Sequence, residues 1–124
     1  MENVIAREVV DASVEVHRFV GPGLLESAYQ RLLLHELQFR GLKVDTEIPV
    51  PISYKGLRIN AAYRMDLVVE GRVVVELKAV ESINASHKAQ LLSYIRLSGM
   101  KLGLLINFNA SLMRDGITRL VNRL

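Results

Sequence analysis

The chain carries near its centre the stretch Tyr63-Arg-Met-Asp-Leu-Val-Val-Glu-Gly-Arg-Val-Val-Val-Glu-Leu-Lys-Ala79. Two apolar, largely β-branched runs flank Glu70-Gly71, a pattern that is typical of a β-hairpin. Their near-continuous apolar character indicates strands that are buried on both faces. The stretch therefore predicts two central strands of a sheet, joined by a tight turn.

Three charged residues interrupt this apolar hairpin: Asp66, Glu76 and Lys78. Burying a charge costs several kcal/mol unless the charge is paired or binds a metal. Side chains alternate between the two faces of a strand, so Glu76 and Lys78 share a face. Asp66 joins them only if the hairpin loop has an odd number of residues or contains a bulge.

The length of the hairpin loop decides whether Asp66 lies beside Glu76. A two-residue turn would point Asp66 away from Glu76. A three-residue loop over 69–71, ending on a left-handed glycine, pairs Asp66 with Val74 and places Glu76 diagonally beside Asp66. We predict this loop or a bulge, because it gathers the charges and leaves a clean apolar face. That apolar face consists of Leu67, Val73, Val75 and Leu77.

The charged residues of the hairpin suit phosphodiester chemistry. Asp66 and Glu76 offer hard oxygen ligands, which Mg²⁺ and Mn²⁺ prefer. Lys78 on the same face would polarise a water molecule or stabilise charge that grows on a phosphate. Two carboxylates and a lysine around a metal are the parts needed to hydrolyse a phosphodiester. The competing interpretation is a structural salt bridge between Lys78 and the acids, and the residues alone leave the two evenly matched.

Composition sets the outer limits of the fold. The chain has 124 residues, of which half are hydrophobic, and a net charge of +3; we expect residues 1–124 to form one globular domain. The absence of cysteine excludes disulfides and thiolate metal sites and fits a cytoplasmic location. The amphipathic N-terminus is not a signal peptide, and no apolar run is long enough to cross a membrane. The mild positive charge permits a nucleic-acid partner without requiring one.

The spacing of apolar residues predicts helices over 2–19 and 24–40, separated by Gly21-Pro22-Gly23. In both helices the apolar positions are expected to face the core. In the first helix they are Val4, Ile5, Val9, Ala12, Val16 and Phe19, and in the second Leu25, Ala28, Tyr29, Leu32, Leu33, Leu37 and Phe39. A strand over 43–54 contains Pro49 and Pro51, which cannot donate to a ladder, so we place it at a sheet edge.

The rest of the chain reads as strand, helix and strand. After the Lys55-Gly56 turn, residues 57–63 lead into the central hairpin. A helix capped by Asn84 or Ser86 ends at Gly99. The apolar run 102–107 follows a crossover helix and is expected to lie parallel to 73–79, and 116–121 adds a last strand. This order predicts an α/β fold, a mixed sheet with helices on both faces.

Other polar residues have ordinary explanations when taken alone. Glu26 lies in the first turn of the second helix, where the helix dipole favours an acid. Gln90 and Tyr94 lie one turn apart and read as a surface amide and a partly buried aromatic. The histidines are scattered without zinc-site spacing, and we expect surface or boundary positions for all of them: His17, His35 and His87.

Asp66 followed by Glu76-Leu-Lys78 resembles the signature of the PD-(D/E)xK nuclease superfamily, an aspartate on one strand and Glu-x-Lys on the next. Gly23-Leu-Leu-Glu26-Ser-Ala-Tyr29 resembles the motif that names the GxxExxY proteins, a bacterial and archaeal branch of that superfamily. Met65 stands where the superfamily's name has a proline, a position that varies. The resemblance spans nearly the whole chain and extends to Gly21-Pro-Gly23, Tyr54-Lys-Gly56, Gln90 with Tyr94, and Gly103-Leu-Leu-Ile-Asn-Phe108.

The resemblance implies a restriction-endonuclease-like core of helix, three strands, helix and strand. It implies that Asp66 and Glu76, joined by Glu26, bind Mg²⁺ or Mn²⁺. It further implies that Lys78 is the catalytic cation and that Gln90 lines the site. The residues that we expect to contact nucleic acid are Tyr94, Lys88 and Arg64.

We therefore expect a divalent-metal-dependent nuclease that acts on DNA or, as a second choice, RNA. The alternative is a catalytically inactive nuclease-fold module that binds nucleic acid or protein, which the small size and modest charge favour. A third interpretation is an interaction protein whose charged cluster is a salt-bridge network. A homodimer is expected if both strands of a duplex are cut, because so small a nuclease would need two copies.

Overall fold

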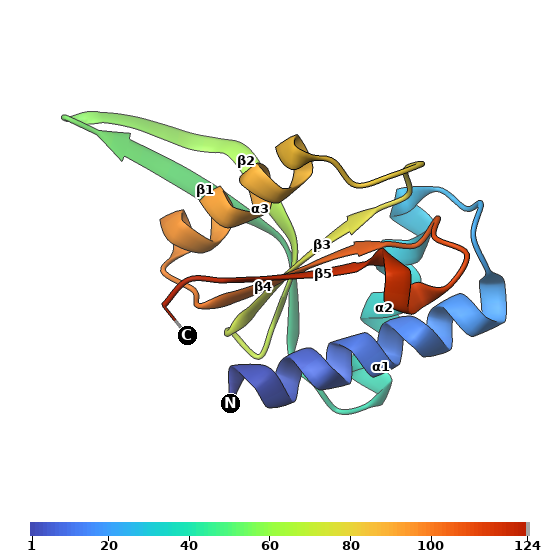
Figure 1. Ribbon diagram of the computed structural model, residues 1–124. Coiled ribbons are helices and arrows are strands. Elements are labelled where there is room, and N and C mark those ends of the chain that lie inside the picture. The colour runs from blue at the N-terminus through green and yellow to red at the C-terminus, as the bar shows by residue number, and fades with distance from the viewer. Residues whose placement is uncertain (124) are drawn as a thin grey trace.

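A mixed sheet of five strands in the order β1-β2-β3-β4-β5 forms the centre of the chain (Figure 1). The computed structural model describes residues 1–123, apart from the side chain of Ala61. The helices are α1 (Glu2–Val20), α2 (Glu26–Phe39) and α3 (Ala85–Ser98). The strands are β1 (Val44–Tyr54), β2 (Leu57–Val69), β3 (Val73–Lys78), β4 (Leu102–Asn107) and β5 (Ile117–Val121), with a 3₁₀ turn at Met113–Gly116.

The α/β fold class and the element order are confirmed. β1 is an edge strand, as its prolines predict, and it pairs with β2 in antiparallel fashion. β3 and β4 are parallel neighbours joined through α3, and β5 closes the sheet as an antiparallel edge strand. Asn84 caps α3 together with His87, and Gly99 ends the helix in the left-handed conformation. Within residues 1–123 no helix has the length and hydropathy needed to span a membrane.

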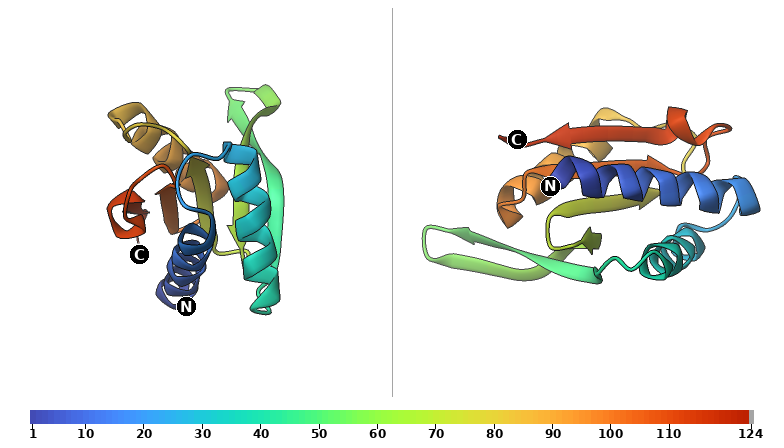
Figure 2. Two further views of the ribbon diagram at one scale, coloured as in Figure 1. Left: turned by 90° about the vertical axis from the view of Figure 1, so that its right-hand side faces the viewer. Right: turned by 90° about the horizontal axis from the view of Figure 1, so that it is seen from below.

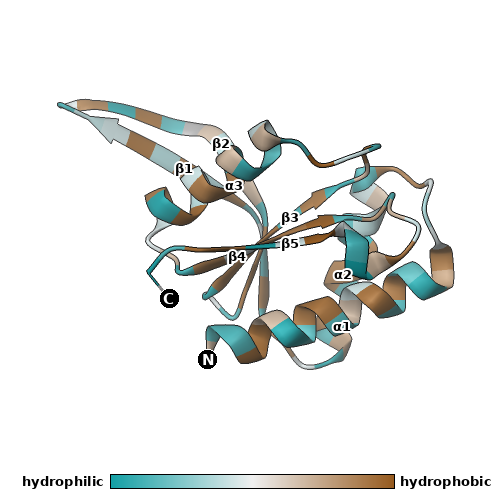
Figure 3. Cartoon of the chain, viewed as in Figure 1, coloured by the Kyte–Doolittle hydropathy of each residue, from teal (hydrophilic) through white to brown (hydrophobic). Residues whose placement is uncertain are grey.

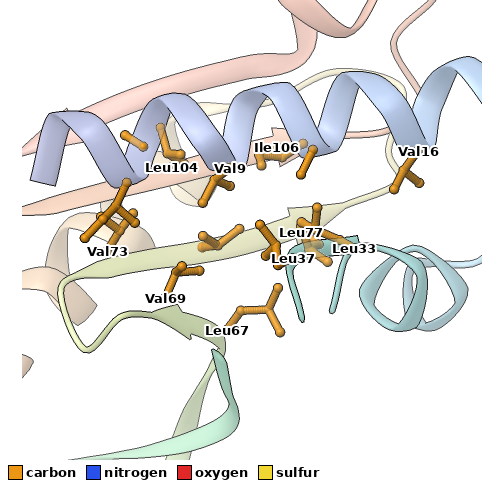
Figure 4. Packing of buried hydrophobic residues seen from close by; sticks show 14 of the residues in the cluster. Val9, Val16, Leu33, Leu37, Leu67, Val69, Val73, Leu77, Leu104 and Ile106 are labelled. Atoms are coloured by element: carbon orange, nitrogen blue, oxygen red, sulfur yellow. The ribbon is translucent and has the colours of Figure 1, made fainter. Parts of the chain in front are cut away.

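The helices cover the sheet from both sides (Figure 2). On one face, α1 and α2 pack on the sheet through the larger apolar cluster, which includes Val9 and Leu33 (Figure 4). On the other face, α3 contributes Leu91, Tyr94 and Ile95 to a smaller cluster. The sheet is therefore buried on both faces, which explains why the apolar runs of β3 and β4 are nearly continuous.

The turn of the central hairpin differs from the predicted loop over 69–71. Val69 pairs with Val73, so the three loop residues are 70–72. Glu70 and Gly71 both have positive φ, and the Arg72 N–H donates to the Val69 carbonyl at 3.0 Å. The odd loop length is confirmed, and the predicted apolar face lies together in the larger cluster: Leu67, Val73, Val75 and Leu77.

Several residues that were expected to face the core are exposed instead. Val4 and Phe19 of α1 are 61% and 81% exposed, and Leu25, which caps α2, and Phe39, which ends it, are 77% and 82% exposed. Leu32 also lies at the boundary. Each helix buries only the narrow stripe that touches the sheet, because the helices lie on the surface of the molecule. The helical spacing of apolar residues alone predicts a wider buried stripe than the structure has.

β1 and β2 continue past the sheet as a two-stranded arm, residues 50–63, with its turn at Lys55-Gly56 (Figure 1). The pairing shifts between Val50 and Ile52, which marks a bulge at the base of the arm. Hydrophobic and hydrophilic residues alternate along it (Figure 3), and the apolar side chains of Tyr54, Leu57 and Ile59 are exposed. The arm therefore presents side chains to solvent well away from the main core.

Candidate active site

Asp66 and Glu76 face each other where β2 and β3 separate. The ladder ends at Leu67 and Val75, and the same register brings Asp66 opposite Glu76. The Asp66 N–H donates to Glu76 Oε2 at 2.7 Å, and the Leu77 N–H donates to Asp66 Oδ2 at 2.8 Å. Each carboxylate is thus held by the backbone of the opposite strand. The prediction that both acids share a face is confirmed, although they lie directly opposite rather than diagonally.

A backbone irregularity in β1 accompanies this arrangement. Glu47 lies between the paired residues that flank Asp66 and has a φ of 52°, which is uncommon for a residue other than glycine. Gln30 of α2 donates from Nε2 to Glu47 Oε1 at 2.9 Å and to the Asp66 carbonyl at 3.3 Å. Met65 and Leu67 pack in opposite clusters although they are two residues apart. β2 therefore changes face at Asp66.

Burial makes the acids hard to ionise. Glu76 is 4% exposed; burial, followed by the charge of Asp66, raises its pKa from 4.5 to about 8. Burial also raises the pKa of Asp66, against the hydrogen bond from Leu77. The ammonium of Lys78 opposes both increases. With a pKa of about 8, Glu76 is largely protonated at neutral pH.

Lys78 lies at the end of β3, half-buried and two residues beyond Glu76. Among the ion pairs of residues 1–123, none involves Lys78, Asp66 or Glu76. The salt-bridge interpretation of the sequence therefore finds no support in the described residues. The ammonium stays available to a group that enters the site.

Glu26 opens α2 with an exposed side chain. Its charge raises the pKa of both Asp66 and Glu76, so it lies within electrostatic reach of them. Within the described part of the chain, however, no three acidic or histidine side chains are close enough together to hold a metal ion. A metal-binding role for Glu26 stays a prediction.

The loop before α2 is held by Tyr29. Its ring stacks on Phe108, with centroids 4.5 Å apart. The Tyr29 hydroxyl donates to the Gly21 carbonyl at 2.6 Å and accepts from the Leu24 N–H at 3.1 Å. Gly23, between them, has a φ of 105° that glycine adopts readily. The Gly-x-x-Glu-x-x-Tyr spacing therefore fixes the loop that sets the position of Glu26.

The four remaining predicted residues lie on α3 and β2. Tyr94 is buried on α3, and its pKa is raised by burial and then by the charges of Glu76 and Asp66. Gln90, one turn earlier on α3, is exposed. Lys88 and Arg64 are also exposed, the former on α3 and the latter two residues before Asp66 on β2.

A family model matches residues 3–120 and is described as the PD-(D/E)XK nuclease superfamily. The chain belongs to this superfamily. No curated protein and no solved structure matches the chain significantly. The fold expected for a PD-(D/E)XK protein, a mixed sheet between helices, is the one found.

Nucleases of the PD-(D/E)XK superfamily generally use divalent metal ions, and the donor set fits such an ion. Asp66 and Glu76 provide hard oxygens, and each uses one of its two for a backbone hydrogen bond. Among described side chains, no fully buried polar atom lacks a partner. The second oxygens are therefore not sealed in the core, and they suit a Mg²⁺-like cation that keeps water ligands.

Sequence reasoning missed two residues of this PD-(D/E)XK site. The first is Asn107, which is buried and pairs with Lys78 across β3 and β4. Its side chain donates to the Val80 carbonyl at 2.9 Å and accepts from the Val80 N–H at 3.1 Å. It anchors the loop that follows Lys78. The sequence feature that could have pointed to Asn107 is its position as a polar amide residue at the end of an apolar strand. Gln30 follows Glu26 by one helical turn, which would have placed both on one face of α2.

Proposed function

We propose that this chain is a divalent-metal-dependent nuclease that hydrolyses phosphodiester bonds, in DNA before RNA. The observation that carries the proposal is the reciprocal anchoring of Asp66 and Glu76, which leaves one oxygen of each for a cation beside Lys78. Backbone-held carboxylates are preorganised, so they lose little freedom when a ligand arrives. If Asp66 and Glu76 served only the structure, the ammonium of Lys78 would be expected to form an ion pair with one of them.

In this proposal Asp66 and Glu76 bind Mg²⁺ or Mn²⁺, and Glu26 approaches the same ion. The ion would supply an activated water and charge neutralisation at the phosphate. Glu76 would release its proton to solvent on binding the ion, because an ionised carboxylate is the better oxygen donor. Lys78 stabilises the negative charge that grows on the phosphate oxygens. Gln90 lines the site from α3.

The same proposal places the chain in the GxxExxY branch. Support comes from Tyr29, whose hydroxyl and ring fix the loop before Glu26. Each named position of the motif thus has a physical part in the site. We further propose one domain over residues 1–124, a cytoplasmic location, which the lack of cysteine favours, and a homodimer when both strands of a duplex are cut.

Tyr94, Lys88 and Arg64 are proposed to contact the nucleic acid. The two basic residues are exposed, so they are free to meet phosphates. Tyr94 lies on α3 within electrostatic reach of both acids, because their charges raise its pKa. Exchanging Lys88 or Arg64 for alanine should weaken binding of all sequences alike and reduce its salt dependence.

Cleavage of single- and double-stranded DNA and of RNA with Mg²⁺ or Mn²⁺ tests the function. Glu76→Gln and Lys78→Met should lose activity by at least about a hundredfold, whereas Glu81→Gln, an exposed acid in the following loop, should not. Activity that persists in both site variants would exclude this site as its source.

The second candidate, an inactive nucleic-acid-binding module, is favoured by the absence of a preformed three-acid cluster in residues 1–123. It predicts salt-sensitive binding without cleavage.

A further inference from the structure

A groove runs between α3 and the base of the arm. Its volume is about 360 Å³, and it is lined by Ile52, Tyr63, Gln90, Ser93, Tyr94 and Leu97. Tyr63 and Leu97 are 47% and 48% exposed. The volume lies at the lower end of the range for small-ligand sites, so it suits a single ring system.

Tyr94 links the groove to the candidate active site. Tyr94 belongs to the groove, and its hydroxyl senses the charges of Asp66 and Glu76. The rings of Tyr63 and Tyr94 have centroids 6.4 Å apart and planes at 55°. The two rings are tilted and not stacked, and Tyr63 is half-exposed, so a face of the Tyr63 ring is open to a ligand.

The two segments that form the groove carry positive charge, which favours a polyanionic ligand. Residues 48–65, which include the arm, contain three basic and no acidic residues. α3 itself (Ala85–Ser98) contains two basic residues, Lys88 and Arg96, and no acidic residue, although the whole chain has 13 acids. An apolar groove between two purely basic segments matches a ligand that combines a flat ring with phosphates. A neutral peptide would explain the apolar lining but not the charge.

We propose that this groove binds an unpaired base of a single-stranded nucleic acid, stacked on Tyr63, while its backbone follows the basic segments toward Asp66 and Glu76. The inference rests on the proposed nuclease function for its ligand class. In a duplex the faces of the bases are covered by their neighbours and only their edges can be reached. Stacking on an aromatic side chain therefore requires an unpaired base, and it accepts any sequence.

Because the chain contains no tryptophan, Tyr63→Trp provides a single fluorescent probe in the groove. Without divalent metal, a short single-stranded DNA should quench its emission, and a duplex of the same sequence should not. The matched control is Phe39→Trp, an exposed aromatic position on α2 at the other face of the sheet. Equal quenching at both positions, or equal quenching by the duplex, would overturn the proposal.

Binding of a labelled strand, followed by anisotropy, provides a second measurement. Tyr63→Ala should weaken it by roughly fivefold to a hundredfold, the range found for loss of one stacked base. Tyr63→Phe keeps the ring and should bind within about twofold of the wild type. Leu97→Glu changes the opposite wall at a half-exposed position and should also weaken binding. Unchanged binding in both Tyr63→Ala and Leu97→Glu would overturn the assignment.

The two proposals fail in different ways. If the wild type cleaves DNA and Tyr63→Ala binds and cleaves like it, the groove assignment is wrong and the nuclease function stands. If no cleavage occurs while binding still depends on Tyr63, the groove assignment stands and the nuclease function is wrong. A change of oligomeric state in Tyr63→Ala, measured by light scattering, would assign the groove to a second copy of the chain and overturn the base-binding proposal.

Discussion

The Glu76 carboxylate lies 2.7 Å from the backbone nitrogen of Asp66, so the more buried acid is anchored by the strand that carries the other acid. The return bond, from Leu77 to Asp66, completes the arrangement. In an ordinary antiparallel ladder these N–H groups would bond to carbonyls. Side-chain oxygens replace carbonyls where the strands part, and this substitution creates the candidate site.

The first prediction concerns stability against pH. Folded Glu76 keeps its proton up to a pKa of about 8, whereas its ordinary pKa is 4.5. Between these values the folded state binds more protons than the unfolded state, so the free energy of unfolding falls as pH rises from about 4.5 through about 8. We expect a loss on the order of a few kcal/mol, measured by urea denaturation without metal. Glu76→Gln should flatten this dependence; equal slopes in both proteins would contradict it.

The second prediction concerns metal affinity. A cation must displace the Glu76 proton, so the apparent affinity for Mn²⁺ should rise as pH increases toward about 8. Calorimetry in buffers of different ionisation enthalpy should detect release of that proton on binding. Glu81→Gln should behave like the wild type, and Glu76→Gln should bind weakly at every pH. A pH-independent affinity would mean that Glu76 is not a ligand.

The third prediction concerns Tyr29. Tyr29→Phe keeps the stack on Phe108 but removes the hydroxyl that bonds Gly21 and Leu24. The loss of two hydrogen bonds should cost about 1–3 kcal/mol of unfolding free energy and reduce cleavage, because Glu26 follows this loop. Tyr54→Phe at the exposed arm is the matched control and should change neither. An unaltered denaturation midpoint in Tyr29→Phe would show that the hydroxyl does not hold the loop.

The fourth prediction concerns Asn107. Its side chain bonds both backbone groups of Val80 and accepts from the Asn109 N–H. Asn107→Leu leaves these groups without partners and should destabilise the fold by roughly 2–3 kcal/mol. Asn109→Ala, at an exposed neighbouring position, should stay within about 0.5 kcal/mol of the wild type. Equal unfolding free energies for the two variants would show that the loop after β3 does not depend on Asn107.

The fold could be predicted from the sequence because the pattern of apolar and turn-forming residues is consistent over long segments. The continuous apolar runs of β3 and β4, the prolines of β1 and the glycine after α3 each have one strong structural meaning. The core stripe of the helices was less accessible. Phe19 and Phe39 follow the apolar spacing, yet they lie beyond the part of each helix that touches the sheet, and only tertiary packing decides that.

The site was predictable in its residues and not in its geometry. The spacing between Asp66 and Glu76 predicts that both side chains share a face when the hairpin loop has an odd number of residues. The change of face at Asp66 and the positive φ of Glu47 could not be foreseen, because a pure alternation rule assumes an unbroken strand. Gln30 was missed for the same reason, since its role is to support that irregular backbone.

The prolines of β1 have a consequence for behaviour in concentrated solution. An edge strand of 11 residues that leads into a partly apolar arm offers a template for cross-chain strand pairing. Pro49 and Pro51 lack the N–H groups that such pairing needs, and they stand where the arm leaves the sheet. They therefore reduce the number of N–H groups that a second chain could pair with along this edge.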